Sequence, residues 1–295
     1  MSVIVCNHLT KDYGHGKGIF DVSLTVAAGE VYGYIGPNGA GKSTTMRHLM
    51  GFCHAQSGSA TIEGRDCWRE ARAVHTRLGY LPGETAFPDD MTGLAYLKLI
   101  ARMRKMRDFS RAEALLERFA LDPNAGIKRM SKGMKQKIGI VAAFMHDPDI
   151  LLLDEPTSGL DPLMQNRFIE LVLEEKRRGK TILLSSHIFD EVEKTCDRIG
   201  MIRGGRLIQE ITSEELRHSR RKTYRVTLTN ASDVARLCAA FPETAAEGLC
   251  VEVSLADAQI NDLIACLAGC QVAALEEKKH TLEEYFMMYY GGEKA

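Results

Sequence analysis

The apolar and polar residues of the chain repeat with two different periods, and the change of period divides the chain into regions. Residues 3–9 and 20–26 alternate between apolar and polar positions, which is typical of antiparallel strands that bury one face. Further along, short continuous apolar runs predict buried strands at residues 31–35, 150–153 and 181–185. Helical spacing occurs between these runs, for example at residues 43–50 and 163–178. This order favours a mostly parallel sheet with helices on both faces.

Residues 87–144 depart from this alternation, because they show no strand pattern. Apolar residues recur there at helical spacing in three segments, at residues 91–106, 110–120 and 131–145. We therefore expect a helical insertion in the α/β domain. The insertion also carries a basic run made of Arg102, Arg104, Lys105, Arg107 and Arg111. A solvated face and a position close to an anionic membrane surface both account for such a run.

A second pattern begins near residue 220, after a charged stretch that is typical of a solvated linker. Six further elements are predicted there, with strands at residues 224–228, 249–255 and 272–275 and helices at residues 231–240, 258–267 and 282–290. The last helix is amphipathic, as expected for a helix that docks onto its own domain. We expect two domains, residues 1–219 and a small α+β domain at residues 220–295.

Composition and charge narrow the class of protein. The 295 residues include 38 Lys+Arg and 39 Asp+Glu, and the net charge of −1 gives no field for bulk nucleic-acid binding. We therefore predict no nucleic-acid partner. Apolar runs such as residues 138–145 are shorter than the roughly 18–20 residues that span a bilayer, and the first six residues lack the features of a signal peptide. The eight cysteines form no CxxC pair, so we expect structural thiols in a reducing cytosol.

A phosphate-binding motif follows the first of the buried strands. The pattern G-x-x-x-x-G-K-[ST] is met by Gly36, Pro37, Asn38, Gly39, Ala40, Gly41, Lys42 and Ser43. Glycines allow backbone N–H groups to turn toward phosphate oxygens, and the helix that begins there adds its positive end. We expect Lys42 to neutralise the β- and γ-phosphates as a catalytic residue and the Ser43 hydroxyl to bind Mg²⁺, with Thr44 beside them in the nucleotide-binding set. A strand–helix turn that needs glycine only for packing is the alternative.

Two carboxylates, Asp154 and Glu155, end the second buried strand. Side chains alternate along a strand, so these two neighbours can take different roles. Asp154 is expected to hold Mg²⁺ through water, and Glu155 to orient and polarise the attacking water. An acidic strand end that leads into a turn at Pro156 is the alternative. His187 follows the third buried strand and is expected to bond the γ-phosphate, although a lone histidine at a strand end is more often a surface residue.

Five motifs together resemble those of ABC-transporter nucleotide-binding subunits, over about residues 3–219. They occur in the family's order and approximate spacing at residues 36–43, 131–137, 152–156, 158–162 and 187. The resemblance implies a P-loop NTPase fold of ABC type, with a mostly parallel sheet core, an antiparallel β subdomain and a helical insertion. It also implies that Tyr13 stacks on the adenine ring. Taken alone, an aromatic residue at a strand end is more often a packing residue.

The same resemblance implies a partner that motif spacing does not reveal. Two such subunits hold two ATP molecules head to tail between them, so the chain is expected to pair with a second copy of itself. Ser131 and Gly133, at the start of a predicted helix, would then contact the γ-phosphate bound to the opposite copy, and a helix start is a suitable anion site. Taken alone, Ser131 is also explained as an ordinary helix N-cap.

Two positions depart from the family pattern. Residues 131–134 read Ser-Lys-Gly-Met in place of Ser-Gly-Gly-Gln, and Lys132 is expected either to lie near phosphate or to face solvent. The glutamine that usually follows the Tyr-Leu-Pro of residues 80–82 is replaced by Gly83. We expect the next residue, Glu84, to take over the contact to Mg²⁺ or water.

These expectations combine into one function. The chain resembles the ATP-binding and hydrolysing subunit of a bacterial ABC exporter. The resemblance implies ATP and Mg²⁺ as cofactors, a separate integral membrane permease as partner, and a peripheral position at the cytoplasmic face of the cell membrane. A soluble regulatory or translation-associated ABC protein and the ATPase of an importer are the alternatives.

Overall fold

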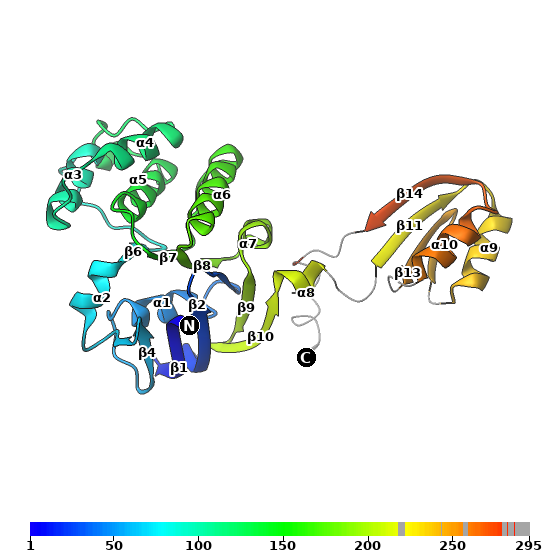
Figure 1. Cartoon of the computed structure of the whole chain (residues 1–295), viewed down its shortest axis with the longest axis horizontal. Coiled ribbons are helices and arrows are strands. Elements are labelled where there is room, and N and C mark those ends of the chain that lie inside the picture. Colours follow the sequence, from blue (N-terminus) through cyan, green and yellow to red (C-terminus); the bar gives the residue numbers. More distant parts are fainter. Residues whose placement is uncertain (218–221, 243, 256–258, 279–281, 283–285, 287–295) are drawn as a thin grey trace. The chain divides into compact units, whose positions relative to one another are not determined.

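The computed structural model describes residues 1–217, 222–242, 244–255, 259–278, 282 and 286. The chain forms two compact units, Met1–Ser213 and Glu214–Ala295 (Figure 1). This boundary lies a little before the one expected after residue 219. Within the described residues, no helix combines the length and the apolar character needed to span a lipid bilayer.

A six-stranded sheet forms the centre of the first unit, in the order β10-β9-β3-β8-β7-β6. Its strands are β3 (Val31–Ile35), β6 (Leu78–Leu81), β7 (Ile150–Asp154), β8 (Thr181–Ser186), β9 (Arg198–Arg203) and β10 (Arg206–Thr212). Neighbouring strands run parallel, except that β10 pairs antiparallel with β9. Every residue of β3, β7 and β8 is buried, as continuous apolar runs predict for a sheet covered on both faces.

A second sheet of the first unit is antiparallel. Its strands are β1 (Ser2–Asp12), β2 (Gly18–Ala27), β4 (Ser57–Ile62) and β5 (Arg65–Asp66). Ile4 of this sheet lies in the same hydrophobic cluster as Leu183 of the central sheet. Helix α1 (Lys42–Leu49) adds Met46 and Leu49, both fully buried, to that cluster. Apolar contacts with both sheets therefore fix the helix that follows the phosphate-binding motif.

The helical insertion lies between β6 and β7. It consists of α3 (Gly93–Met103), α4 (Ser110–Arg118), the short 3-10 helix η1 (Ile127–Arg129) and α5 (Lys132–Phe144). All residues between β6 and β7 are described, and none of them belongs to a strand. The helical insertion predicted from the change of period is thus present, and in Figure 1 its α-helices gather at one end of the unit.

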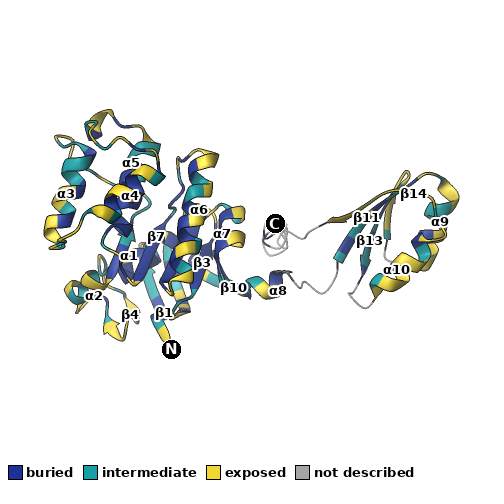
Figure 2. Ribbon diagram, turned by 45° about the horizontal axis from the view of Figure 1, so that its top comes forward, coloured by how far each residue is buried: buried dark blue, intermediate teal, exposed yellow. Residues whose placement is uncertain are grey.

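Three further helices complete the first unit, and α8 (Ser213–Arg217) starts at its last residue. They are α2 (Ala71–Arg77), α6 (Pro162–Arg177) and α7 (Phe189–Thr195). Figure 2 shows that their exposed residues lie outward and that buried residues concentrate in the sheets. The sequence predicted α6 but neither α2 nor α7, because helices of seven residues contain too few apolar positions to define a period.

From residue 222 onward, the described residues of the second unit follow the element order β-α-β-β-α-β, and their strands form an antiparallel sheet, β12-β13-β11-β14. Its elements are β11 (Lys222–Leu228), α9 (Ala231–Ala240), β12 (Thr244–Glu247), β13 (Cys250–Leu255), α10 (Ile260–Leu267) and β14 (Val272–Lys278). Both helices cover one face of the sheet (Figure 2), where Leu237 and Leu263 join its apolar core. The helix expected at residues 282–290 lies outside the described residues, except for Leu282 and Phe286, which are buried.

Candidate nucleotide-binding and hydrolysis site

The candidate site residues follow three strands that the central sheet places side by side. β3 and β7 both pair in parallel with β8, so that Ile35 lies opposite Ser186 and Asp154 lies opposite Ser185. The carboxyl ends of parallel strands lie at one edge of a sheet, which is where such sheets bind ligands. The phosphate loop after β3, the carboxylates at the end of β7 and His187 after β8 therefore meet at this edge.

The phosphate loop joins β3 to α1 and needs its glycines for two different reasons. A Cβ atom at Gly36 would lie 2.4 Å from the carbonyl oxygen of Ile202 on β9, so a larger residue does not fit there. Gly41 is the N-cap of α1 and has a φ angle of +115°, which L side chains rarely adopt. At the tip of the loop, residues 37–39 are exposed, whereas Ala40 is buried. Packing explains the first glycine, and the turn of the backbone explains the second.

Three charged side chains meet beside this loop. Lys42 has only 4% of its side chain exposed, and its Nζ donates to the carbonyl oxygens of Gly36 (2.7 Å) and Pro37 (3.2 Å). The same nitrogen lies 3.2 Å from Oε1 of Glu155. Oε2 of Glu155 lies 3.0 Å from Nδ1 of His187. The fold thus brings together the three residues that the sequence predicts to be catalytic, with the Glu155 carboxylate between the other two.

The backbone of Glu155 has a rare conformation. Its φ angle is +47°, in the left-handed region that few residues other than glycine adopt. Its N–H donates to the carbonyl oxygen of Ser185 on β8 (3.0 Å). Its own carbonyl accepts hydrogen bonds from the N–H of Ser158 (3.1 Å) and from Nε2 of Gln136 (3.2 Å). Such conformations persist only where the surroundings hold them, and they concentrate at functional sites.

The oxygen atoms predicted to bind Mg²⁺ also belong to this edge of the sheet. Asp154 is 2% exposed, and its carboxylate accepts a hydrogen bond from the hydroxyl of Ser185. Ser43 lies exposed in the first turn of α1, followed by the half-buried Thr44. A carboxylate and a hydroxyl form an all-oxygen donor set, which suits Mg²⁺. The residues present therefore fit this ion.

The segment that replaces the usual glutamine approaches Asp154 through glycine. A Cβ atom at Gly83 would lie 3.1 Å from Oδ2 of Asp154, so the backbone passes close to this carboxylate. Glu84 comes next in the chain and is exposed. The role expected of Glu84 in binding Mg²⁺ stays a prediction.

Tyr13 lies directly after β1 and has 52% of its surface exposed. Nζ of Lys11 lies 5.7 Å from the centre of its ring. A ring that is half exposed adds little to the hydrophobic core, so simple packing is a poor explanation for this residue. The ring is accessible to a ligand, as stacking on adenine requires.

The start of α5 packs on the turn that follows Glu155. Ser131 is the N-cap of α5, and its Oγ accepts a backbone N–H of the first turn (3.2 Å) while the residue stays exposed. A Cβ atom at Gly133 would lie 2.6 Å from the carbonyl oxygen of Gly159. Lys132 is exposed, as one of its two expected positions requires, and its Nζ also donates to Oγ of Ser158 (2.9 Å). The N-cap role of Ser131 leaves its hydroxyl hydrogen available to a ligand.

Glu191 on α7 is a buried carboxyl group beside the site that the sequence patterns do not reveal. Its Oε2 accepts hydrogen bonds from the hydroxyls of Ser186 (2.7 Å) and Thr157 (3.2 Å). It therefore links the residue before His187 to the turn after Glu155. Burial raises the pKa of Glu191 to about 7, and the charge of Glu155 acts in the same direction. No local spacing distinguishes this residue from the other acidic residues of α7.

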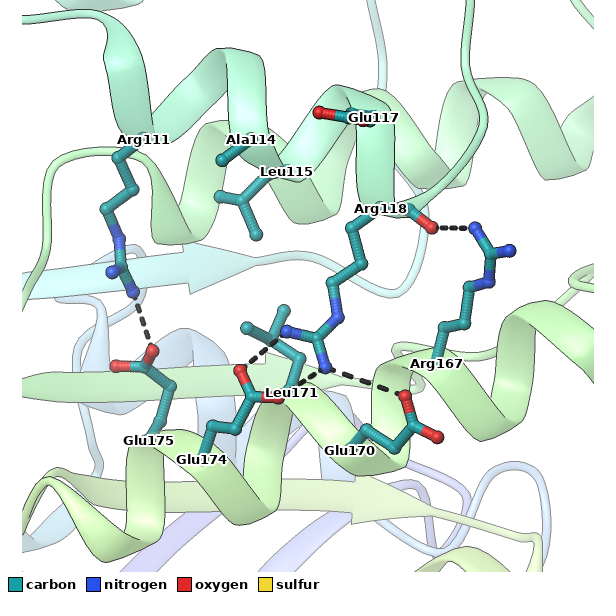
Figure 3. A pocket seen from close by; sticks show the side chains of 10 residues that line it. All are labelled: Arg111, Ala114, Leu115, Glu117, Arg118, Arg167, Glu170, Leu171, Glu174 and Glu175. Carbon is teal, nitrogen blue, oxygen red and sulfur yellow. Dashed lines mark hydrogen bonds and ion pairs between the residues drawn. The ribbon is translucent and has the colours of Figure 1, made fainter.

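A hollow of about 570 Å³ between α4 and α6 holds a further set of charges (Figure 3). Nη1 of Arg118 lies 2.6 Å from Oε2 of Glu174, and Nη2 of Arg111 lies 2.7 Å from Oε1 of Glu175. Arg167 donates to the carbonyl oxygen of Arg118. The ion pairs of Arg111 and Arg118 connect the helical insertion to α6, and Arg167 is hydrogen-bonded, so the hollow is a poor site for an anion. Arg111, a member of the basic run at residues 102–111, thus has a structural role in an ion pair.

A larger groove of about 1040 Å³ is lined by residues of α2 and α3. Its apolar residues include Phe52 and Met103, which are 57% and 72% exposed. Arg104, a second member of the basic run, donates from this groove to the carbonyl oxygens of His75 (3.3 Å) and Leu78 (3.1 Å). The groove thus exposes the apolar residues Phe52 and Met103, whereas its Arg104 is held by hydrogen bonds to the backbone.

The phosphate loop, the carboxylates at the end of β7 and the mostly parallel sheet define a P-loop nucleoside-triphosphatase domain with a helical insertion. A sequence profile of the ABC transporter family matches residues 19–158. The ABC transporter ATP-binding protein NatA of Bacillus subtilis (strain 168) is 41% identical over 211 residues, which cover 70% of this chain and 86% of that protein. The bacitracin transport ATP-binding protein BcrA of Bacillus licheniformis is 31% identical over 301 residues, which cover 99% of this chain and 98% of that protein. The chain belongs to the family of ABC transporter ATP-binding proteins.

Solved structures agree with this assignment. The structure of an ATP-binding subunit of an ABC transporter has a TM-score of 0.67 and 32% identity, and covers 74% of this chain and 93% of that one. The dimeric structure of MJ0796, a bacterial ABC transporter cassette, has a TM-score of 0.65 at 21% identity. It covers 71% of this chain and 98% of that one, and it supports the fold alone. The predicted family, fold class and enzyme class are therefore confirmed, and the chain is an ABC-type ATPase.

Proposed function

We propose that this ATPase powers export through a separate permease at the cytoplasmic face of the bacterial membrane. The observation that carries hydrolysis is the contact of the Glu155 carboxylate with both Lys42 and His187. Export is supported by similarity over nearly the whole chain to two proteins named for bacitracin transport and daunorubicin resistance. The second of these, DrrA3 of Streptomyces coeruleorubidus, is 32% identical and covers 99% of this chain and 97% of its own length.

ATP is proposed to bind with its phosphates on the loop at residues 36–43 and its adenine on Tyr13. Lys42 is proposed to neutralise the β- and γ-phosphates. When it does so, it gives up its contact with Glu155. A phosphate oxygen is a strong partner for an ammonium group, and the backbone N–H groups of the loop supply further donors. Binding of ATP thereby releases Oε1 of Glu155 from Lys42 at the place where water is to be activated.

Hydrolysis then needs a group that accepts a hydrogen bond from the attacking water, and Glu155 is proposed for this role. His187 contacts the same carboxylate and is proposed to donate to the γ-phosphate through its other ring nitrogen. Bound Mg²⁺, held by Asp154 and Ser43 and assisted by Glu84, would neutralise charge that develops on the phosphates. The fixed carboxylate and the fixed donors supply orientation and electrostatic stabilisation of the transition state.

A second copy of the chain is proposed to complete each nucleotide site. Ser131 is exposed at the start of α5, where the helix dipole favours an anion. Gly133 lies in the same first turn of α5. Together they are proposed to contact the γ-phosphate bound to the other copy, so that two ATP molecules lie head to tail between two chains.

The groove lined by α2 and α3 is proposed to receive a cytoplasmic helix of the permease. Exposed apolar residues at its rim, including Phe52 and Met103, suit the apolar face of an amphipathic helix. Purification of the chain from bacterial membranes should therefore recover an integral membrane protein. Recovery with ribosomes in place of a membrane protein would contradict the proposal and favour a translation-associated role.

The hydrolytic assignment is tested with two variants. Glu155→Gln should keep ATP affinity, lose hydrolysis and accumulate an ATP-bound dimer, because the amide no longer polarises water. Lys42→Ala should lose ATP binding itself. Binding is measured with a fluorescent ATP analogue and dimerisation by size-exclusion chromatography with light scattering. Hydrolysis by Glu155→Gln at the wild-type rate, or unchanged ATP binding by Lys42→Ala, would contradict the assignment.

A further inference from the structure

We infer that Gln136 is a positioning residue, which holds Glu155 in its active conformation and couples it to the start of α5 on the same chain. Gln136 is not expected to touch ATP. The inference rests on the proposed function, because it takes Glu155 as the group that activates water and Ser131 as the group that contacts nucleotide on the other copy.

The side-chain amide of Gln136 binds two successive carbonyl groups of the turn after β7. Gln136 is 4% exposed, and its Nε2 lies 3.2 Å from the carbonyl oxygen of Glu155 and 2.7 Å from that of Pro156. An amide nitrogen carries two hydrogens, so one side chain can serve both acceptors. Buried carbonyl groups need donors, and here a residue of α5 supplies them.

One of these hydrogen bonds is made to Glu155, whose backbone has the rare conformation described above. The φ angle of +47° at Glu155 is sterically disfavoured, so the chain would return to a negative φ if its contacts were lost. Such a change redirects the side chain, which now reaches both Lys42 and His187. The bonds from Gln136 tie the turn to α5, and the bond to Ser185 ties it to β8.

Gln136 is one of three residues that fix the first turns of α5 to this turn. Nζ of Lys132 donates to Oγ of Ser158 at 2.9 Å. Gly133 packs so closely on Gly159 that a Cβ atom would lie 2.6 Å from its carbonyl oxygen. The exposed N-cap of the same helix is Ser131. When that N-cap contacts a phosphate, the helix and the turn move as one body, and the position of Glu155 changes with them.

The test replaces Gln136 by methionine, which has a similar length and suits a buried site but donates no hydrogen bond. In Gln136→Met, kcat for ATP hydrolysis should fall about 10- to 100-fold, as misplaced catalytic groups typically cause. KM and the affinity for a fluorescent ATP analogue should stay within about 3-fold. The Hill coefficient for ATP should exceed one in the wild type and fall to one in the variant, since the link between the two sites is cut.

Gln165→Met is the matched control, because Nε2 of Gln165 donates to the carbonyl oxygen of Leu160 in the same loop (3.2 Å) without touching Glu155. It should keep the wild-type kcat. Lys132→Met changes an exposed residue, so folding is preserved, and it should lower kcat in the same direction by a smaller factor. Thermal melting of each variant checks that the fold is intact.

The outcomes separate this inference from the function on which it rests. If Gln136→Met or Lys132→Met hydrolyses ATP with the kcat and Hill coefficient of the wild type, the inference is wrong. If ATP affinity falls in parallel with kcat, Gln136 is only a structural residue, which also overturns it. If the wild type itself fails to hydrolyse ATP, or Glu155→Gln fails to dimerise with ATP, the proposed function fails instead.

Discussion

Replacing Glu191 by glutamine should make the free energy of unfolding less dependent on pH. Burial, reinforced by the charge of Glu155, raises the pKa of Glu191 from 4.5 to about 7 in the folded protein. Between these values the folded state binds a proton that the unfolded state has released. The contribution of Glu191 to wild-type stability therefore falls as the pH rises from about 4.5 to about 7, and it stays constant above that range.

The size of the effect follows from the pKa difference. One pKa unit corresponds to about 1.4 kcal/mol, so ionised Glu191 costs the folded state about 3 kcal/mol above pH 7. Glutamine removes the charge and keeps an oxygen for the hydroxyls of Ser186 and Thr157. Its NH₂ group takes the place of Oε1, a buried atom that has no hydrogen-bond partner, at a cost of about 1 kcal/mol. The variant should therefore be about 2 kcal/mol more stable than the wild type above pH 7, and no more stable below about pH 4.5.

Urea unfolding near pH 5 and near pH 8 measures this difference. The fluorescence of Trp68, the single tryptophan of the chain, follows the unit that contains Glu191. Glu193→Gln, which changes an exposed carboxylate on the same helix, is the control and should keep the pH dependence of the wild type. If Glu191→Gln also keeps the wild-type pH dependence, then Glu191 does not have the raised pKa on which the prediction depends.

Gly36→Ala should destabilise the first unit by about 1–3 kcal/mol in urea and abolish ATP binding, because its Cβ would lie 2.4 Å from the carbonyl oxygen of Ile202. Gly126→Ala, where nothing lies within 4 Å of the added carbon, is the control, and equal unfolding midpoints for the two variants would refute the packing argument. Arg118→Ala should lower the free energy of unfolding by about 0.5–1 kcal/mol through loss of its ion pair with Glu174. The loss should shrink in high salt, and a salt-independent loss would assign it to packing instead.

Much of the fold follows from local patterns. The strand predicted at residues 31–35 coincides with β3, and the helix predicted at residues 231–240 coincides with α9. Continuous apolar runs and long periodic segments carry enough positions to define an element without its neighbours. The strands β9 and β10 were not predicted, because their pairing with the central sheet decides their structure more than their own short sequences do.

The candidate site divides in a similar way. Lys42, Asp154, Glu155 and His187 can be read from the sequence, since each belongs to a short motif at the end of an apolar strand. Lys132 shows the limit of that approach, because its contact with Ser158 depends on how α5 packs against a distant turn. A motif identifies a reactive group, but not the groups that hold it in place.

The amino-acid sequence by itself determined which groups stand at the ends of the central strands, because those groups are neighbours of the strands along the chain. Only the tertiary structure decided what surrounds them. Gln136 reaches the carbonyl of Glu155 across 19 residues, and Glu191 reaches Thr157 across 34. A hydrogen bond needs its donor and acceptor within about 3 Å, and over such separations packing of helices on the sheet sets that distance.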